Sequence, residues 1–350
     1  MNFQEMIESY RKDFFRRSNG FNLPYIDYLG STLVPEPNLN RDTNTLFIAI
    51  PVKNQQDIIV EVIRSLIKNT TKPATIGFLF DNCTDSTQDL CQNFFQENIK
   101  ELQNIKKIHF IKSSGDLFES TCENILFLFC EEKYFVSMQA DIYLNDSSWF
   151  ERCIKALSAN SSLFALTGRA VVPFRPINKI RRYTSKVINL LTSNIYVVNK
   201  RKIRLGMYIK NLGYFGNNCN YPKTTMYFSK KEFNTVYLGD SIIRGPIMWK
   251  SQIFKSLGSF NDLSYWLGRD DTDLCLRARY SGYLVGYLPS KAYSISDQGS
   301  SRKKRSQDVL AQMELRAILA KNQKGSLDAY WTDMKKYKSY KRLHKSKIKI

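Results

Sequence analysis

Residues 46–86 read LFIAIPVKNQQDIIVEVIRSLIKNTTKPATIGFLFDNCTDS, and this stretch decides the fold. Residues 46–50 are a continuous apolar run of strand length, which Pro51 stops. Residues 56–68 then carry apolar side chains at the spacing of an amphipathic helix, and residues 75–80 are a second apolar run. A strand, a helix and a strand in this order predict two parallel strands joined by a crossover helix.

The alternation continues along the chain. Thr84 or Asp85 can cap a helix that runs to about residue 95, and it is followed by a strand at 108–112, a helix at 119–132 and a strand at 134–138. Continuous apolar strands are typical of a sheet that is covered on both faces. The prediction is an α/β fold in which helices flank a doubly wound, mostly parallel sheet.

The remaining segments have weaker patterns. Residues 1–45 are expected to form a helix and a loop rich in Pro and Asn. Farther along, the spacing predicts helices at 250–257 and 271–281 and a last strand at 283–288. A terminal helix is expected at 306–322, before a lysine-rich tail.

Composition excludes several classes of protein. The chain has 350 residues, of which 43% are hydrophobic, so it can bury a core and is not disordered throughout. It lacks an uncharged apolar run long enough for a transmembrane helix, and its N-terminus does not resemble a secretory signal. The seven cysteines are widely spaced, which favours a reducing, cytoplasmic compartment. With two distant histidines, His109 and His344, any catalysis must depend on carboxylates.

The net charge of +20 is concentrated in two segments. Residues 175–231 contain 13 Lys and Arg and no Asp or Glu, and residues 302–350 contain 15 Lys and Arg against four acids. Apolar residues at helical spacing occur beside basic ones near residue 180. Localised positive charge of this kind indicates a polyanion or an anionic membrane surface as a partner.

Polar residues follow each predicted strand of the sheet. Ligands bind beyond the carboxyl ends of the strands in such folds, so these residues are the first candidates for a binding site. They are Lys53 and Asn54, Asp81 and Asn82, residues 113–116, and residues 139–141.

Three acidic motifs have both a structural and a chemical interpretation. Asp81 and Asp85 in DNCTDS are common turn residues, and Asp141 after QA is a common capping residue. An oxygen-ligand metal such as Mg²⁺ or Mn²⁺ also suits Asp141. In GRDDTDL, residues 268–274, the helix dipole accounts for one or two of the three acids. A carboxylate at this helix start, beside Trp266, suits a general base for a sugar hydroxyl.

The order IPVKN, DNCTDS, QAD and GRDDTDLCLR, followed by GYLVGYLP, resembles the family 2 glycosyltransferases, which have the GT-A fold. The resemblance covers roughly residues 45–170 and 240–295. Each motif is short, but four of them in the right order and at approximate spacing are considerably more specific than any one.

The resemblance implies a role for each matching residue. Asp271 would be the catalytic base, with Asp270 next to it as the alternative. Asp141, the last acid of a D-x-D motif, would bind Mn²⁺ or Mg²⁺. Gly245 and Trp266 would border the acceptor site. The nucleotide would contact Pro51, Val52, Asn54, Asp81, Asn82 and Gln139, and Asp81 would accept a hydrogen bond from uracil.

Two departures from the family pattern concern the metal. Gln139 stands where the first acid of D-x-D is usual, and a neutral amide adds no charge to a metal site. Many members also place a His after the last strand, but the segment AYSISDQGSSR contains none. Asp297 is the acid in this segment that could take its place.

The resemblance also implies a division of the chain and a reaction. After residues 1–45 we expect a nucleotide-sugar-binding half (46–174), a basic insert (175–239), an acceptor and catalytic half (240–300) and a basic helical extension (301–350). The implied reaction is an inverting transfer, from a UDP-sugar rather than another nucleotide sugar, to a hydroxyl of a glycan or lipid-linked acceptor. From the basic segments 175–231 and 335–350, and not from the resemblance, we expect a cytoplasmic enzyme held at the cytoplasmic face of an anionic membrane; the alternative is a solvated basic face that only keeps the protein soluble.

Two other functions stay open at this point. A nucleotidyltransferase has a similar fold, but it would normally carry a glycine-rich basic loop after the first strand, where this chain has PVKNQQD. A nucleic-acid-binding protein without enzymatic activity would explain the net charge, yet the chain has no recognisable nucleic-acid-binding motif.

Overall fold

A computed structural model describes residues 2–35, 44–172, 195–198, 201–204, 215–216, 233–239, 241–263, 270–294 and 347–349. Trp266, Asp297, the expected helix at 306–322 and most of the two basic segments lie outside the described residues.

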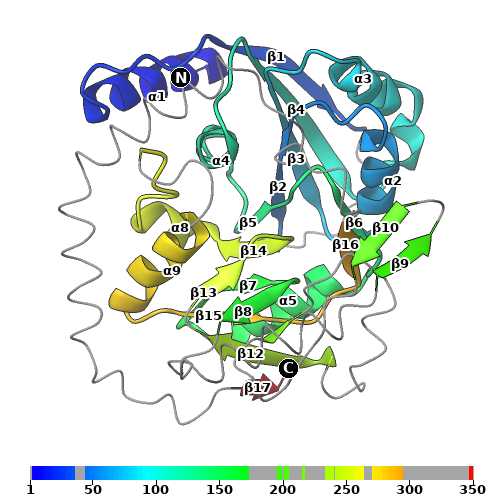
Figure 1. The fold of residues 1–350 in the computed structure, drawn as a ribbon, viewed down its shortest axis with the longest axis vertical. Helices are drawn as coiled ribbons and strands as arrows, with labels where there is room; N and C mark the ends of the chain where they lie inside the picture. Colours follow the sequence, from blue (N-terminus) through cyan, green and yellow to red (C-terminus); the bar gives the residue numbers. More distant parts are fainter. Residues whose placement is uncertain are drawn as a thin grey trace.

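The core of the molecule is a sheet of ten strands (Figure 1). In spatial order they are β1 (Ile26–Leu33), β4 (Ile105–Ser113), β3 (Ala74–Asp81), β2 (Leu46–Val52), β5 (Tyr134–Ser137), β14 (Ile247–Lys250), β7 (Leu163–Thr167), β15 (Leu284–Tyr287), β12 (Thr235–Gly239) and β17 (Lys347–Lys349). The run from β4 to β5 is parallel, as predicted, and β7 and β15 are also parallel. The other pairings are antiparallel, so the sheet is mixed.

Helices cover both faces of this sheet, which confirms the predicted α/β architecture. One face carries α2 (Ile59–Asn69), α3 (Thr87–Glu97) and α5 (Trp149–Ala159), and the other carries α1 (Phe3–Arg17), α4 (Glu119–Phe127), α8 (Ser251–Ser256) and α9 (Asp270–Tyr280). Figure 1 shows α2 and α3 on one side of β2–β4 and α1 and α4 on the other.

Strand β2 is apolar throughout because its side chains are buried on both faces of the sheet. Ile48 and Ile50 pack in the core on the α2 side, whereas Phe47 and Ala49 pack in the core on the α4 side. All four side chains are fully buried, and burial of each large one stabilises the fold by about 1.5–3 kcal/mol. Substitution by a polar residue on either face would therefore disrupt a packed core.

The structure differs from the expected elements in the N-terminal region and in α4. Residues 26–33, expected in a loop, form strand β1, which pairs antiparallel with β4 and has an irregular register between Tyr28 and Gly30. Helix α4 ends at Phe127 instead of residue 132, and a turn at 128–130 leads toward β5. The shorter helix lets β5 start at Tyr134, inside the parallel part of the sheet.

Short strands form smaller sheets beside the main one. β6 (Ile142–Leu144) pairs with β16 (Ala292–Ser294), β13 (Ser241–Ile243) and β11 (Phe215–Gly216) both pair with β8 (Ala170–Val172), and β9 (Ile195–Val198) pairs with β10 (Arg201–Arg204). Within the ranges that the structure describes, every helix is too short or too polar to span a bilayer.

Candidate active site

An asparagine follows each of the strands β2 and β3, and the first of them, Asn54, joins the two strand ends. Asn54 and Asn82 have φ angles of 48° and 49°, in the left-handed region that asparagine tolerates better than most residues. The Asn54 side chain accepts a hydrogen bond from the backbone N–H of Thr84 at 2.9 Å and donates one to the Thr84 hydroxyl at 3.2 Å. The two strand ends therefore form one connected surface.

Asp81, at the end of β3, is buried and shapes the loop before α4. Its Oδ1 accepts a hydrogen bond from the N–H of Leu117 at 2.6 Å, and its Oδ2 accepts one from the N–H of Phe118 at 3.2 Å. Phe118 has a φ of 66°, an unfavourable conformation for a bulky residue. The carboxylate stabilises the sharp turn from which α4 begins. Burial raises the pKa of Asp81, and the charge of Lys53 opposes this shift.

Lys53 and Asp116 add an ion pair to this surface, in which Asp116 is buried and Lys53 is half-buried. Lys53 Nζ bonds to Oδ1 of Asp116, and Asn82 donates to the same oxygen at 3.0 Å. Of the other predicted nucleotide residues, Val52 is buried and its carbonyl accepts from the thiol of Cys83, whereas Pro51 is half-buried. The structure thus brings the predicted residues of β2 and β3 together.

A second cluster forms around Arg244, which follows β13. Its guanidinium contacts Glu119 at 2.9 Å and Glu123 at 2.7 Å, both on α4, and also bonds to Asp270 on α9. Gln139 donates from its amide to Glu119 at 3.0 Å. Gln139, predicted to contact the nucleotide, is therefore linked to the neighbourhood of the predicted catalytic acids.

Asp270 and Asp271 have different environments. Asp270 is only 1% exposed, and its Oδ2 is bonded to Arg244 and accepts from the hydroxyl of Ser120 at 2.7 Å. Asp271 is half-buried; its Oδ2 accepts from the N–H of Arg244 at 3.1 Å and its Oδ1 from the N–H of Thr272 at 2.6 Å. Burial raises the pKa of Asp271 above its ordinary value, and the Arg244 charge opposes this. An acid with a raised pKa that is reachable by solvent is suited to accept a proton.

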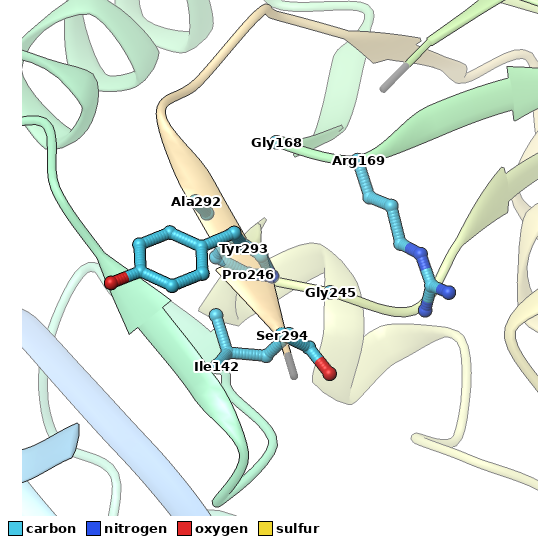
Figure 2. Close-up of a pocket in the computed structure, with 8 residues that line it drawn as sticks. All are labelled: Ile142, Gly168, Arg169, Gly245, Pro246, Ala292, Tyr293 and Ser294. Atoms are coloured by element: carbon cyan, nitrogen blue, oxygen red, sulfur yellow. The ribbon is translucent and has the colours of Figure 1, made fainter. Parts of the chain in front are cut away.

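Asp141 lies beside a pocket that is lined by residues of β6 and β16 and of the segments 168–169 and 245–246. Ser294 on β16 donates from its hydroxyl to Asp141 Oδ2 at 2.9 Å. Figure 2 shows this pocket, with Arg169 and Gly245 toward one side and Tyr293 and Ile142 toward the other. Gly245, predicted to border the acceptor, is one of the residues that line it. A Cβ atom at residue 245 would lie 2.8 Å from Cβ of Arg169, so the close approach requires glycine.

The predicted metal ligand among the described residues is the carboxylate of Asp141. Across the part of the chain that the structure describes, His, Cys, Asp and Glu side chains nowhere form a group of three that could hold a metal ion. Asp141 is an oxygen donor of the type that Mg²⁺ and Mn²⁺ prefer, and Gln139 could add a carbonyl oxygen. This donor set fits a metal that is shared with a second oxygen-rich ligand.

A family model described as Glycosyl transferase family 2 matches residues 47–231, which is more than half of the chain. The chain belongs to glycosyl transferase family 2. The match spans β2–β5, with Asp81 and Asp141, and it ends before Arg244 and the acids of α9. Membership agrees with the resemblance that the sequence motifs indicate.

Solved glycosyltransferase structures are similar to this family 2 chain at low identity. The mannosyltransferase PcManGT from Pyrobaculum calidifontis, in complex with GDP-Man and Mn²⁺, is 14% identical, with 82% of this chain and 63% of that chain covered and a TM-score of 0.44. GalNAc-T7 with UDP, GalNAc and Mn²⁺ is 12% identical, with 71% of this chain and 43% of that chain covered and a TM-score of 0.47. S. aureus TarS 1-349 in complex with UDP-GlcNAc is 13% identical, with 79% of this chain and 66% of that chain covered and a TM-score of 0.43. The chain thus spans less than two thirds of the length of these structures. None of the curated proteins compared with it matches.

Several residues of the site were not predicted from the sequence of this family 2 chain. Arg244, Glu119 and Glu123 form the ion-pair cluster, although no motif marks them. Lys53 and Asp116 were noted only as residues at strand ends. The signal for Lys53 and Asp116 was their position, because each follows a strand of the main sheet; Arg244 and Glu123 gave no such signal. Trp266 and Asp297 lie outside the described residues, so their predicted roles stay predictions.

Proposed function

We propose that this chain transfers a sugar from a nucleotide-diphosphate donor, a UDP-sugar in the first place, to a hydroxyl of a glycan or lipid-linked acceptor, with inversion at the anomeric carbon. The observation that carries the proposal is the contrast at the start of α9. Asp270 is bound in an ion pair with Arg244, whereas Asp271 is half-buried with a raised pKa. Because the chain belongs to glycosyl transferase family 2, we assign this carboxylate the role of the base in glycosyl transfer.

The donor would occupy the surface at the ends of β2 and β3. Pro51, Val52, Asn54, Asp81 and Asn82 are proposed to contact the nucleotide. Oδ1 of Asp81 accepts from the N–H of Leu117 and from the hydroxyl of Ser113 at 3.4 Å, whereas Oδ2 accepts from the N–H of Phe118 and keeps a further lone pair, with which it can accept from uracil. Lys53 lies at the same edge, and its ammonium group would have to leave its ion pair with Asp116 to bind a phosphate of the donor.

The proposed reaction is a single displacement. Asp271 takes the proton of the acceptor hydroxyl as that oxygen attacks the anomeric carbon, and the bond from this carbon to the diphosphate breaks. The nucleoside diphosphate leaves with the bonding electrons. No covalent intermediate forms, so the site needs no nucleophilic Ser or Cys.

Asp141 is proposed to hold Mn²⁺ or Mg²⁺, with Gln139 as a neutral neighbour and Asp297 as a candidate further ligand. When bound, the metal would stabilise the negative charge of the leaving diphosphate. The contact from Ser294 orients the Asp141 carboxylate, as an outer-shell hydrogen bond commonly does.

The proposal is tested by incubating the full chain with a panel of UDP- and GDP-sugars and Mn²⁺ and by measuring the nucleoside diphosphate released. We expect release from at least one UDP-sugar, faster than from the GDP-sugars. Release above the no-enzyme control identifies a transferase that uses water as an acceptor. A chain that releases nothing from any donor and binds nucleic acid tightly would support the non-enzymatic alternative.

The basic segments support a proposed location at the cytoplasmic face of an anionic membrane, near a lipid-linked acceptor. Residues 335–350 alone contain eight basic residues and no acidic one. Each basic residue near such a surface contributes about 1 kcal/mol, and salt weakens the attraction. We expect the whole chain to co-sediment with anionic liposomes more than with neutral ones, and a chain that ends at Met334 to bind less. Equal sedimentation with both kinds of liposome would contradict the proposal.

A further inference from the structure

Arg244 is a buried cation that joins elements from distant parts of the sequence. Its side chain is 10% exposed and its guanidinium lies over the ring of Phe260, 4.8 Å from the centroid. It contacts Glu119 and Glu123 on α4, which belongs to the nucleotide half, and Asp270 on α9, which carries the proposed base. Arg244 therefore links α4 to α9, in addition to the direct hydrogen bond from Ser120 on α4 to Asp270 on α9.

The main chain of Arg244 is fixed on both sides. Its N–H donates to Oδ2 of Asp271 at 3.1 Å, and its carbonyl accepts from the guanidinium of Arg169 at 2.8 Å. Gly245 next to it leaves room for the side chain of Arg169. A shift of Arg244 would consequently move the hydrogen bond that orients Asp271.

The charges around Asp271 make Arg244 electrostatically important as well. Within the described residues, Asp271 interacts electrostatically with Arg244 and with the thiol of Cys275, and Arg244 in turn pairs with Glu119, Glu123 and Asp270. Burial, with repulsion from Glu119, raises the pKa of Glu123 to about 7 even though Arg244 faces it. The carboxylates thus outnumber the cation that holds them together.

We propose that Arg244 is a positioning residue for the reaction proposed above: its backbone N–H orients the Asp271 carboxylate, and its guanidinium supplies the positive charge that keeps this carboxylate ionised among neighbouring acids. The hydrogen bond and the positive charge come from the same residue, so the guanidinium of Arg244 stays close to the Asp271 carboxylate. The inference rests on the proposed function only for the identity of the reaction, because the charge and the hydrogen bond belong to the structure itself.

The prediction concerns the titration of Asp271 in Arg244→Gln and Arg244→Lys. Removing a cation that lies near a carboxyl group typically shifts the pKa of that group by about one unit or more. We therefore expect the pKa of Asp271 to be higher by about one unit in Arg244→Gln than in the wild type. Arg244→Lys keeps the charge and should leave the value near that of the wild type. The measurement is carboxyl ¹³C NMR of aspartate-labelled protein, with the Asp271 signal assigned through Asp271→Asn.

A second variant covers the case in which Arg244→Gln fails to fold. Glu119 is 26% exposed, and Glu119→Gln removes one negative charge without a change of shape. In this variant the pKa of Asp271 should fall, by less than it rises in Arg244→Gln. An Asp271 pKa that stays unchanged in Arg244→Gln, or does not fall in Glu119→Gln, would overturn the proposal and leave Arg244 a purely structural residue.

The NMR titration does not need turnover, so it separates this inference from the proposed function. If the wild type releases nucleotide from a donor, the acid limb of its kcat against pH should move in the same direction as the titration. If the wild type releases none, the proposed function fails while the NMR titration still decides the role of Arg244.

Discussion

The Asp271→Asn variant is expected to lose turnover by about 10²–10⁴-fold, the usual contribution of a general base, while it binds the donor as tightly as the wild type. Asparagine keeps the shape of the side chain and its hydrogen bond from the N–H of Arg244, but it cannot take a proton. The measurement is steady-state release of nucleoside diphosphate, combined with calorimetry of UDP binding.

Two neighbouring acids serve as controls for this variant. Asp273 is ion-paired with Arg277 at 2.8 Å, so Asp273→Asn should lower thermal stability and leave the turnover of folded protein near the wild-type value. Asp270→Asn removes the partner of Arg244. If Asp271→Asn kept near-normal turnover while Asp270→Asn was inactive, the base would be Asp270; near-normal turnover in both would remove the mechanism.

The raised pKa of Asp271 also fixes the pH dependence of turnover. The base must be deprotonated to accept a proton, so activity falls as the pH drops through the pKa of Asp271. Because burial raises this pKa above its ordinary value of 3.8, the acid limb should lie at a higher pH than for an exposed aspartate. Asp271→Asn should lose this limb along with its activity.

The Asp141→Ala variant is expected to lose at least about 100-fold of metal-dependent turnover, because a bound metal stabilises the charge on the leaving group by several kcal/mol. Asp141 offers the metal one carboxylate and Gln139 adds no charge, so Mn²⁺ should bind weakly alone and more tightly with UDP, whose diphosphate oxygens complete the coordination. Calorimetry of Mn²⁺ with and without UDP measures this difference.

The matched control for Asp141 is Asp146, which is ion-paired with Arg152 at 2.7 Å. Asp146→Asn should be less stable than the wild type but should need Mn²⁺ to the same degree. Excess EDTA should abolish wild-type turnover, and added Mn²⁺ should restore it. Full turnover in EDTA would show that the reaction needs no divalent metal.

The parallel part of the sheet could be predicted because the burial of each strand and helix is visible in its own stretch of sequence. β2 and β3 are buried on both faces and so read as unbroken apolar runs, and α2 shows its buried face as a regular spacing. β1 lies at the edge of the sheet, where most of its side chains are only partly buried, so it has no such pattern. β14 has four residues and runs directly into α8 at Ser251, so no break in the sequence separates this strand from the helix.

The candidate site could be predicted to the extent that it lies at strand ends. Asn54 and Asp81 follow directly from the rule that parallel strands meet at one edge of the sheet. Arg244 does not, because its partners Glu119 and Glu123 are more than a hundred residues away in sequence and meet it only through packing of α4 against α9. A buried acid such as Glu123 also looks like any helical glutamate until its partner is seen.

The central claim is a single displacement assisted by Asp271, and the anomeric configuration of the first product tests it most directly. With an α-linked UDP-sugar and water as acceptor, ¹H NMR at early times should show the β-anomer before mutarotation mixes the two forms. With a simple alcohol as acceptor the product should be the β-glycoside, which does not mutarotate. Both products should form about 10²–10⁴-fold more slowly in Asp271→Asn. Formation of the α-anomer first by the wild type would contradict the account, because retention requires a mechanism other than one in-line attack.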